Sequence, residues 1–347
     1  MNRRQTTLSD LAKALGISTA TVSRALKNYP DISTETKVKV LEMARSMHYR
    51  PNTLAAGLRM RESKIIGVIV PSIVDHFFSS VIKGIMEVAY QADYRVMLCQ
   101  SDESYEKEVA DTRALFASRV DGILVSVAHG TKEYEHFEEI RQAGVPLVFF
   151  DKVPADVIGV SKVVVNDYEG ALRVVEHLIG QGCRRIAHFR GPMVASTSRE
   201  RFRGYEAALQ QHGIPVDPSL IYDCEDLTLE EGISLSQRLL REHSDCDGIF
   251  AVTDTVALGA ATALKQAGKR IPTDLAVAGF SDWKISSIVE PPLTSVAQPS
   301  LEMGRKAAEL ILREINATKD ELPFEAETII LDTELKIRTS SQRRPAS

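Results

Sequence analysis

Short apolar runs alternate with longer helical segments from Lys64 almost to the C-terminus, and few folds accept such an alternation. The run KIIGVIV at 64–70 predicts a strand that ends before Pro71, and a helix is expected from Phe77 to Ala92. Later strands follow at a spacing of roughly 25 residues. This pattern is typical of parallel sheets, because each parallel strand needs a crossover, usually a helix, before the next strand.

The alternation occurs twice along the chain. The first half predicts strands at 96–99, 122–127 and 147–150 and helices at 106–118 and 133–143. The second half predicts strands at 185–189, 221–223, 248–252 and 275–280 and helices at 170–179, 199–212, 229–242 and 255–266. We therefore expect an α/β protein with two doubly wound parallel-sheet lobes. A helix at 301–314 should cross back to the first lobe, and residues 327–336 should return as a last strand before a polar, disordered tail, SSQRRPAS.

The N-terminal segment predicts a separate all-α head. Thr7 followed by Asp10 is typical of a capped helix start, and Gly16 ends this first helix. Ser18 is expected to cap a second helix at 19–26. Two helices joined by a turn that contains glycine form a helix-turn-helix, whose second helix enters the major groove of DNA.

A third helix is expected to begin after Ser33 and to run to about His48. The expected inward face of the second helix is Val22, Ala25 and Leu26, and that of the third helix is Val38, Leu41, Ala44 and Met47. The expected outward face of the second helix is Thr19, Ala20, Ser23, Arg24 and Lys27.

The head and the rest of the chain carry opposite charge. Residues 1–64 contain 12 Lys and Arg against five Asp and Glu, whereas the whole chain has a net charge of −5. The head is therefore at +7 and the remainder at −12. A basic module on an acidic body favours nucleic-acid binding, because neutralising phosphates releases condensed counterions.

Three segments in order, ISTATVSRALKN, ISTETKVKVLEMARSMHYRPNTLAAGLR and KIIGVIVP, resemble the LacI/GalR (lac repressor-like) family of bacterial transcription regulators. The resemblance covers essentially the whole chain. It implies that Thr19, Ala20 and Arg24 occupy the base-reading positions of the recognition helix. A guanidinium can bind the O6 and N7 atoms of guanine in a bidentate manner, and the alternative for Arg24 is a phosphate contact.

Residues 51–63 form the expected hinge. This segment is too short and too rich in weak helix formers to be a stable helix alone. The resemblance implies that it folds on DNA, with Leu58 as an apolar wedge in the minor groove, Ala55 reading beside it and Asn52 in the same segment. The alternative is a flexible linker.

We expect four parts of the chain. They are a DNA-binding domain at 1–50, the hinge at 51–63, an N-terminal lobe at 64–165 plus 298–327, and a C-terminal lobe at 166–297 plus 328–347. The lobes resemble sugar-binding periplasmic proteins, in which ligands bind beyond the carboxyl ends of the strands, where the two lobes face each other.

The resemblance also implies where an effector binds. Phe77 or Phe78 would stack on a ring, with the hydrophobic core as the alternative place for both. Thr197 and Arg201 match the family's polar residue and arginine, and an arginine fork suits a carboxylate, a phosphate or vicinal hydroxyls. The alternative for Arg201 is a surface pair with Glu200 or Glu206. Ala195 stands where some purine-binding members carry another arginine, which argues against a purine.

Further effector candidates follow three other strands. Asp151 ends one of them, and Thr253 ends another, whereas the neighbouring Asp254 is expected to cap the next helix. The family often has Asp directly after a G-F/Y pair, but here Ser281 takes that place and Asp282 follows, so either residue could meet the ligand. Trp283 would wall the cleft, and Asn166–Asp167 would lie at the first crossover as hinge structure.

Other classes of function find little support. There is no GxSxG, GxxxxGK[ST], HExxH or strand-following GxGxxG motif, and the eight His are dispersed, so we expect no enzyme. The four cysteines are scattered, without metal-ligand spacing, and we expect neither a metal nor another cofactor. A transport protein would need a signal peptide in place of the basic head. No apolar stretch is long enough to span a membrane.

We therefore expect a cytoplasmic, sequence-specific repressor that binds double-stranded DNA at a pseudo-palindromic operator as a homodimer. A small molecule, with a sugar as the favoured class, would bind between the lobes and control the hinge. An activator, a protein co-regulator and an enzyme with a DNA-targeting domain are the alternatives.

Overall fold

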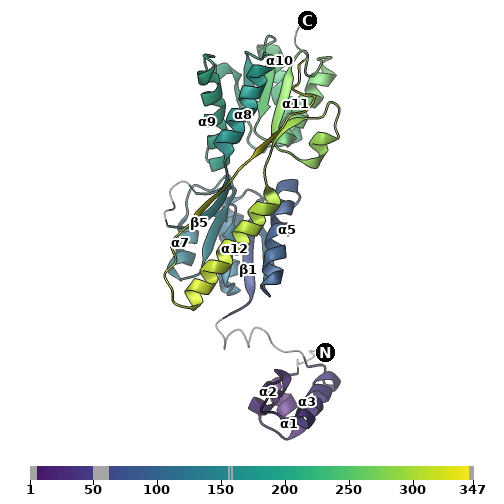
Figure 1. The fold of residues 1–347 in the computed structure, drawn as a ribbon, viewed down its shortest axis with the longest axis vertical. Coiled ribbons are helices and arrows are strands. Elements are labelled where there is room, and N and C mark those ends of the chain that lie inside the picture. The colour runs from purple at the N-terminus through teal and green to yellow at the C-terminus, as the bar shows by residue number, and fades with distance from the viewer. Residues whose placement is uncertain (1–5, 50–61, 155–156, 158, 344–347) are drawn as a thin grey trace. The chain divides into compact units, whose positions relative to one another are not determined.

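The computed structural model describes residues 6–49, 62–154, 157 and 159–343 (Figure 1). Contacts between Cα atoms divide the chain into two units, with the boundary between Ser63 and Lys64. Within the described residues, the first unit is a head of three helices, and the second is an α/β body with two sheets.

The head contains α1 (Leu8–Leu15), α2 (Thr19–Leu26) and α3 (Thr34–Ser46). Thr7 and Asp10 form the expected capping box, in which each side chain accepts a backbone N–H of the other residue. Gly16 ends α1 in a left-handed conformation with φ of 66°, which glycine adopts at little cost. Ser18 and Ser33 cap α2 and α3, as the sequence predicted.

The core of the head differs from the prediction for α3. Leu11, Val22 and Val40 are fully buried, but Val38 is 48% exposed and Leu41 is 43% exposed. The buried face of α3 is instead Val40 and Ala44, with Met43 and Met47 packed beside them. The prediction is confirmed for Ala44 and Met47 but wrong for Val38 and Leu41. Residues 38, 41 and 44 share a helical face as regularly as 40, 43, 44 and 47 do, so periodicity alone allowed either stripe.

The first lobe contains a sheet of six strands in the order β11-β5-β4-β3-β1-β2. Its strands are β1 (Ile65–Val70), β2 (Arg95–Gln100), β3 (Gly122–Val125), β4 (Leu147–Phe150), β5 (Ser161–Val165) and β11 (Thr328–Leu331), and all pairs are parallel. Its helices are α5 (His76–Gln91), α6 (Tyr105–Ala117), α7 (Glu135–Gln142) and α12 (Ser300–Lys319). Helices α5 and α12 cover one face, and α6 and α7 cover the other.

The second lobe repeats this plan in a sheet of order β12-β10-β9-β8-β6-β7. Its strands are β6 (Ile186–Arg190), β7 (Ile221–Asp223), β8 (Gly248–Ala251), β9 (Ala276–Ser281), β10 (Thr294–Ala297) and β12 (Glu334–Lys336), of which only β12 is antiparallel to its neighbour. Its helices are α8 (Asp167–Gly180), α9 (Ser196–Gln211), α10 (Leu229–Glu242) and α11 (Asp254–Gln266), with 3-10 turns at Pro218–Leu220 and Lys284–Ser287. Helices α8 and α9 cover one face, and α10 and α11 cover the other. The predicted fold class is confirmed.

Helices pack closely where glycines meet. Gly84 of α5 and Gly304 of α12 face each other, and a Cβ atom on either would collide with the backbone of the other helix. The close approach places Val81, Ile85 and Met303 in a fully buried core under the sheet.

Two parts of the predicted topology need correction. Strands β5 and β10 were not predicted, and one strand was expected at 327–336 where the structure has two. Strand β11 pairs with β5 in the first lobe, so 328–331 do not belong to the second lobe, to which the predicted boundary assigned them. Strand β12 then pairs with β10 in the second lobe, and the chain therefore crosses between the lobes at Asp332–Thr333.

The C-terminal segment also differs from the prediction of a disordered tail. Ser340 and Ser341 are buried, and the backbone of Ser340 exchanges hydrogen bonds with Val277 and Pro292. The prediction was wrong because polar residues were read as solvated, whereas here they satisfy backbone groups beside β9 and β10. Within the part of the chain that the structure describes, no helix is both long and apolar enough to cross a membrane.

Candidate DNA-reading surface and effector site

The recognition helix α2 presents the predicted residues on its open side. Thr19, Ala20 and Arg24 are exposed, and Ser23 is partly buried. Val22 and Ala25 fix the opposite side in the core of the head. The other three predicted DNA-binding residues, Asn52, Ala55 and Leu58, lie outside the described residues.

Arg24 makes contacts within the head that the sequence did not reveal. Its Nη2 atom lies 2.5 Å from Oδ2 of Asp31, in the turn before α3. Its guanidinium also lies over the ring of Tyr29, with 5.5 Å between Cζ and the ring centroid. The arginine is therefore held by two neighbours on the open surface.

In the body, the carboxyl ends of the two sheets meet. The residues after β4 contact the start of α9 directly, since the backbone N–H of Val153 donates to Oγ of Ser196 at 3.1 Å. Strands β1, β3 and β4 end at this junction from one lobe, and β6, β8 and β9 end there from the other. This is where ligands of doubly wound sheets bind.

Arg201 is the most constrained candidate at the junction. It is 5% exposed; its Nε donates to Oδ1 of Asp167 at 2.7 Å, and its Nη1 donates to the carbonyl of Val252 at 2.7 Å. Its Cζ lies 3.8 Å from the centroid of the Phe280 ring. The alternative of a surface pair with Glu200 or Glu206 is wrong, because the arginine is buried against Asp167.

Asp151 lies opposite Arg201 on the first lobe. It is buried, has a positive φ of 58°, and approaches Oγ of Ser126 to 3.5 Å. Burial raises the pKa of its carboxyl to about 7, with Asp167 and Asp75 acting in the same direction and Lys152 and Arg201 against it. Near neutral pH this group can therefore both donate and accept a hydrogen bond.

Three residues at the same edge were missed by the sequence analysis. Lys152 is buried and ion-paired with Glu103, which also accepts from the backbone N–H of His129 at 2.7 Å and lies 3.0 Å from its Nδ1. These partners hold the pKa of Glu103 down at about 2, although burial opposes them. The sequence offered one signal for these residues, which is that Lys152 directly follows the candidate Asp151. Glu103 lies after a turn and belongs to no motif.

Phe77 and Phe78 lie in the core, which was the stated alternative to stacking on a ligand. They are 8% and 6% exposed and pack edge to face at 5.2 Å between centroids. Asp75 caps α5 just before them by accepting from the backbone N–H of Phe77. Lys152 lies over the Phe78 ring at 5.9 Å, so this ring forms a wall behind the charged pair.

The second lobe corrects one capping prediction. Thr253, not Asp254, caps α11 by accepting from the backbone N–H of Val256. Asp254 is buried and accepts from the N–H of Trp283 at 2.8 Å, and from the hydroxyls of Ser286 at 2.7 Å and Ser295 at 2.5 Å. Asp254 therefore fixes the loop after β9, and Trp283 belongs to this loop.

The last residue of β9 and the first residue of that loop have positive φ angles. Ser281 has φ of 114° and Asp282 has φ of 50°, and the carboxylate of Asp282 lies 2.7 Å from Nη2 of Arg338. Thr197, near the start of α9, is buried. Asn166 caps α8 at the first crossover, and Asp167, expected only as hinge structure, is the partner of Arg201.

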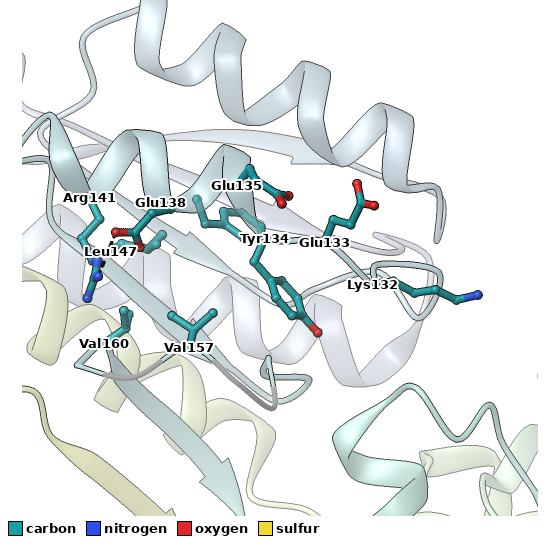
Figure 2. A pocket seen from close by; sticks show the side chains of 10 residues that line it. Lys132, Glu133, Tyr134, Glu135, Glu138, Arg141, Leu147, Val157 and Val160 are labelled. Carbon is teal, nitrogen blue, oxygen red and sulfur yellow. Dashed lines mark hydrogen bonds and ion pairs between the residues drawn. The ribbon is translucent and has the colours of Figure 1, made fainter.

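Other hollows in the body lie away from these residues. A cavity of about 530 Å³ lies beside α7 and is lined by Tyr134, Glu138 and Val160 among others (Figure 2). None of the predicted effector residues lines it. The cationic residues at the junction are instead each matched by a carboxylate, in the pairs Arg201–Asp167, Lys152–Glu103 and Arg338–Asp282.

Comparisons with known proteins agree with this architecture. Residues 7–52 match the model of bacterial regulatory proteins of the lacI family, and residues 175–341 match a periplasmic binding protein-like domain. The ribose operon repressor of Halalkalibacterium halodurans is 32% identical over 97% of both chains. A transcriptional regulator CelR–cellobiose complex has a TM-score of 0.74 and 28% identity over 97% of this chain and all of that one.

The lac repressor dimer bound to operator and an anti-inducer has a TM-score of 0.84 over 98% of this chain and all of that one, at 24% identity, which shows the fold alone. Head and body together define a DNA-binding transcription regulator with a periplasmic-binding-protein-like effector domain. The chain belongs to the LacI family of bacterial regulatory proteins.

Proposed function

We propose that this regulator is a repressor whose affinity for a pseudo-palindromic operator is controlled by an uncharged sugar bound between the two lobes. The observation that carries the proposal is the Arg201–Asp151 constellation at the junction of the sheets. The names of two similar proteins, a ribose operon repressor and a regulator in complex with cellobiose, support a sugar as the ligand class.

The charge balance of the junction argues for an uncharged ligand. Arg201 is neutralised by Asp167 and Lys152 by Glu103, so neither cation has a full charge left for a phosphate or carboxylate. Asp151 and Asp75 add carboxyl groups without further cations. An anionic ligand would therefore meet net negative charge, whereas sugar hydroxyls can donate to Asp151 and accept from the remaining N–H groups of Arg201.

The ligand would act by favouring one arrangement of the lobes. A ligand shifts such an equilibrium only by its difference in affinity for the two states, and typical couplings are ~1–3 kcal/mol. The hydrogen bond between Val153 and Ser196 is one contact that depends on how the lobes meet. The hinge residues Asn52, Ala55 and Leu58 would report this arrangement to DNA.

We infer a homodimer from an uncovered surface of the first lobe. Strand β2 has a strand neighbour on one side only, among the described residues, and it exposes Met97 and Leu98. Helix α5 beside it exposes Met86 and Tyr90 at 53% and 72%. An open edge with apolar side chains needs cover, and a second copy of the chain would provide it. We also infer that the protein acts in the cytoplasm and catalyses no reaction.

The ligand class can be tested by thermal unfolding with a panel of neutral sugars, sugar phosphates, sugar acids and purines. A ligand at 100 times its dissociation constant adds ~2.7 kcal/mol to the free energy of unfolding. We expect a shift with a neutral sugar and none with its phosphate. Trp283, the single tryptophan, gives an independent fluorescence signal from the loop after β9.

Arg201→Lys is the matched variant, because it keeps the charge opposite Asp167 but loses the fork. It should weaken binding of that sugar at least tenfold while the protein stays folded. A shift with sugar phosphates alone, or full sugar binding by Arg201→Lys, would contradict the proposal.

A further inference from the structure

An acidic side chain holds the arginine of the recognition helix. Asp31 follows α2 by five residues and places Oδ2 at 2.5 Å from Nη2 of Arg24. Tyr29 is tied to the same arginine twice, because its N–H donates to the carbonyl of Arg24 at 3.1 Å and its ring lies under the guanidinium. The side chains of Arg24 and Asp31 are 51% and 43% exposed, so the pair lies on the surface of the head.

A carboxylate here is unexpected on electrostatic grounds alone. The DNA-binding surface must approach phosphates, and a negative charge beside Arg24 weakens that attraction. An arginine that served only as a phosphate anchor would bind better without Asp31. The pair is understandable if the orientation of the guanidinium matters more than its net charge.

The geometry leaves Arg24 able to read a base. A guanidinium has five N–H donors in a fixed plane, and the 2.5 Å contact of Asp31 is with its Nη2 atom. The remaining donors suffice for a bidentate contact with O6 and N7 of guanine. Asp31 and Tyr29 together restrict the rotation of a long side chain, which would otherwise lose rotamer freedom on binding.

We propose that Asp31 is a positioning residue that orients Arg24 toward a guanine and thereby sets sequence discrimination. The inference rests on the proposed function, in which Arg24 contacts a base of the operator. The positioning role predicts opposite effects of removing the carboxylate on sequence discrimination and on binding to unrelated DNA. Removing the carboxylate lowers the preference for the guanine, because Arg24 is no longer oriented, and it strengthens binding to unrelated DNA, because a negative charge is lost.

The test uses the full-length protein and a duplex selected by it from a randomised library. Dissociation constants are measured at one salt concentration on this duplex, on versions with each G·C pair replaced in turn, and on an unrelated duplex. We expect Asp31→Asn to reduce discrimination at one G·C pair about threefold, and Arg24→Lys to reduce it at the same pair about tenfold or more. In the Arg24→Lys background, Asp31→Asn should reduce discrimination no further.

Glu35→Gln is the matched control for charge. Glu35 is an exposed carboxylate of α3 that pairs with Lys39, whereas Arg24 pairs with Asp31. The Glu35→Gln substitution should strengthen binding to unrelated DNA as Asp31→Asn does, but leave discrimination at the G·C pair unchanged. Circular dichroism of each variant checks that the helices of the head are retained.

The outcomes separate the inference from its premise. If Arg24→Lys discriminates as well as the original protein, Arg24 reads no base, and both the premise and the role of Asp31 are rejected. If Arg24→Lys loses discrimination but Asp31→Asn keeps it, the proposed function stands and the positioning role is wrong. The same conclusion follows if Asp31→Asn reduces discrimination as much in the Arg24→Lys background as it does in the original protein.

Discussion

At the scale of single residues, His188 is a buried histidine that is not among the predicted DNA-binding or effector-binding residues. It lies in β6, is fully buried and stacks on Tyr205 and Phe250 at 4.9 and 4.7 Å between centroids. Its Nδ1 lies 2.9 Å from the carbonyl of Phe250, and its Nε2 has no partner within the part of the chain that the structure describes. Burial, with Arg190 and Arg201 nearby, lowers the pKa of His188 to about 4.

This shift predicts a loss of stability in mild acid. The unfolded chain binds the proton near pH 6.5 and the folded protein only near pH 4, so unfolding takes up a proton between these values. Stability contributed by the neutral ring is complete above pH 6.5 and is lost as pH falls toward 4, by about 3 kcal/mol in total. We expect His188→Phe to be less stable at pH 7.5, where it lacks a hydrogen bond, but to lose less stability on acidification.

Urea unfolding at several pH values measures this directly. The difference in the free energy of unfolding between the two proteins should shrink from pH 7.5 to pH 4.5. A constant difference over that range would show that His188 does not titrate differently in the folded state.

The site residues show what sequence reasoning can reach at this scale. Asp151 and Thr253 directly follow predicted strands, so topology was enough to place each of them at the carboxyl end of its sheet, whereas Arg201 was found from the family resemblance. The ion pairs of the site could not be predicted from the sequence, because Arg201–Asp167 and Lys152–Glu103 each join segments that are distant in the chain. The same limit applies to Asp254, whose partners are 29 to 41 residues away.

At the scale of elements, the C-terminal segment behaves as part of the second sheet. Ser340 donates its Oγ–H to the carbonyl of Val277 at 2.6 Å and accepts from the N–H of Thr294 at 2.8 Å. Its backbone accepts from the N–H of Val277 and donates to the carbonyl of Pro292, both at 2.9 Å. Ser341 adds contacts of 2.6 Å to the Thr294 hydroxyl and 2.7 Å to Nε2 of His177.

We therefore expect a protein that stops after Thr339 to be markedly less stable. Four hydrogen bonds of Ser340 are lost, each worth ~1 kcal/mol net, so the free energy of unfolding should fall by roughly 3–5 kcal/mol. Gln342→Ala, at an exposed position in the same segment, is the matched control and should stay within about 0.5 kcal/mol. Equal stability of the truncated and full-length proteins would show that the segment does not stabilise the fold.

Most elements were predictable from the sequence because each strand is a short apolar run with a clear boundary. Strand β5 was missed because SKVVV follows a loop, DKVPADVIGV, that already contains three valines, so no period separates strand from connection. Strands β11 and β12 were merged because only two residues, Asp332 and Thr333, separate them, and no local signal marks a change of lobe. Such a change is decided by pairing with distant strands, which single-sequence patterns do not contain.

At the scale of the whole molecule, the head and the body carry opposite net charges and interact differently with DNA. The basic head attracts DNA, and the acidic body is repelled by it, so contacts of the body with phosphates are disfavoured. Affinity for an operator then depends on how many heads act together. Two heads joined in one dimer bind a pseudo-palindrome with a high effective concentration, because the second contact is intramolecular.

Dimerisation through the uncovered surface of the first lobe should therefore control operator affinity. Leu98→Arg introduces a charge on the edge strand β2, beside the exposed side chains of α5, and should weaken self-association at least tenfold. Operator affinity should fall with it, because a monomer brings one head, while thermal stability at high dilution stays unchanged. Ile330→Arg is the matched control, since Ile330 is 60% exposed on β11 at the opposite edge of the same sheet. Sedimentation of both variants decides the matter: a dimer that survives Leu98→Arg, or one that dissociates with Ile330→Arg, would place the interface elsewhere.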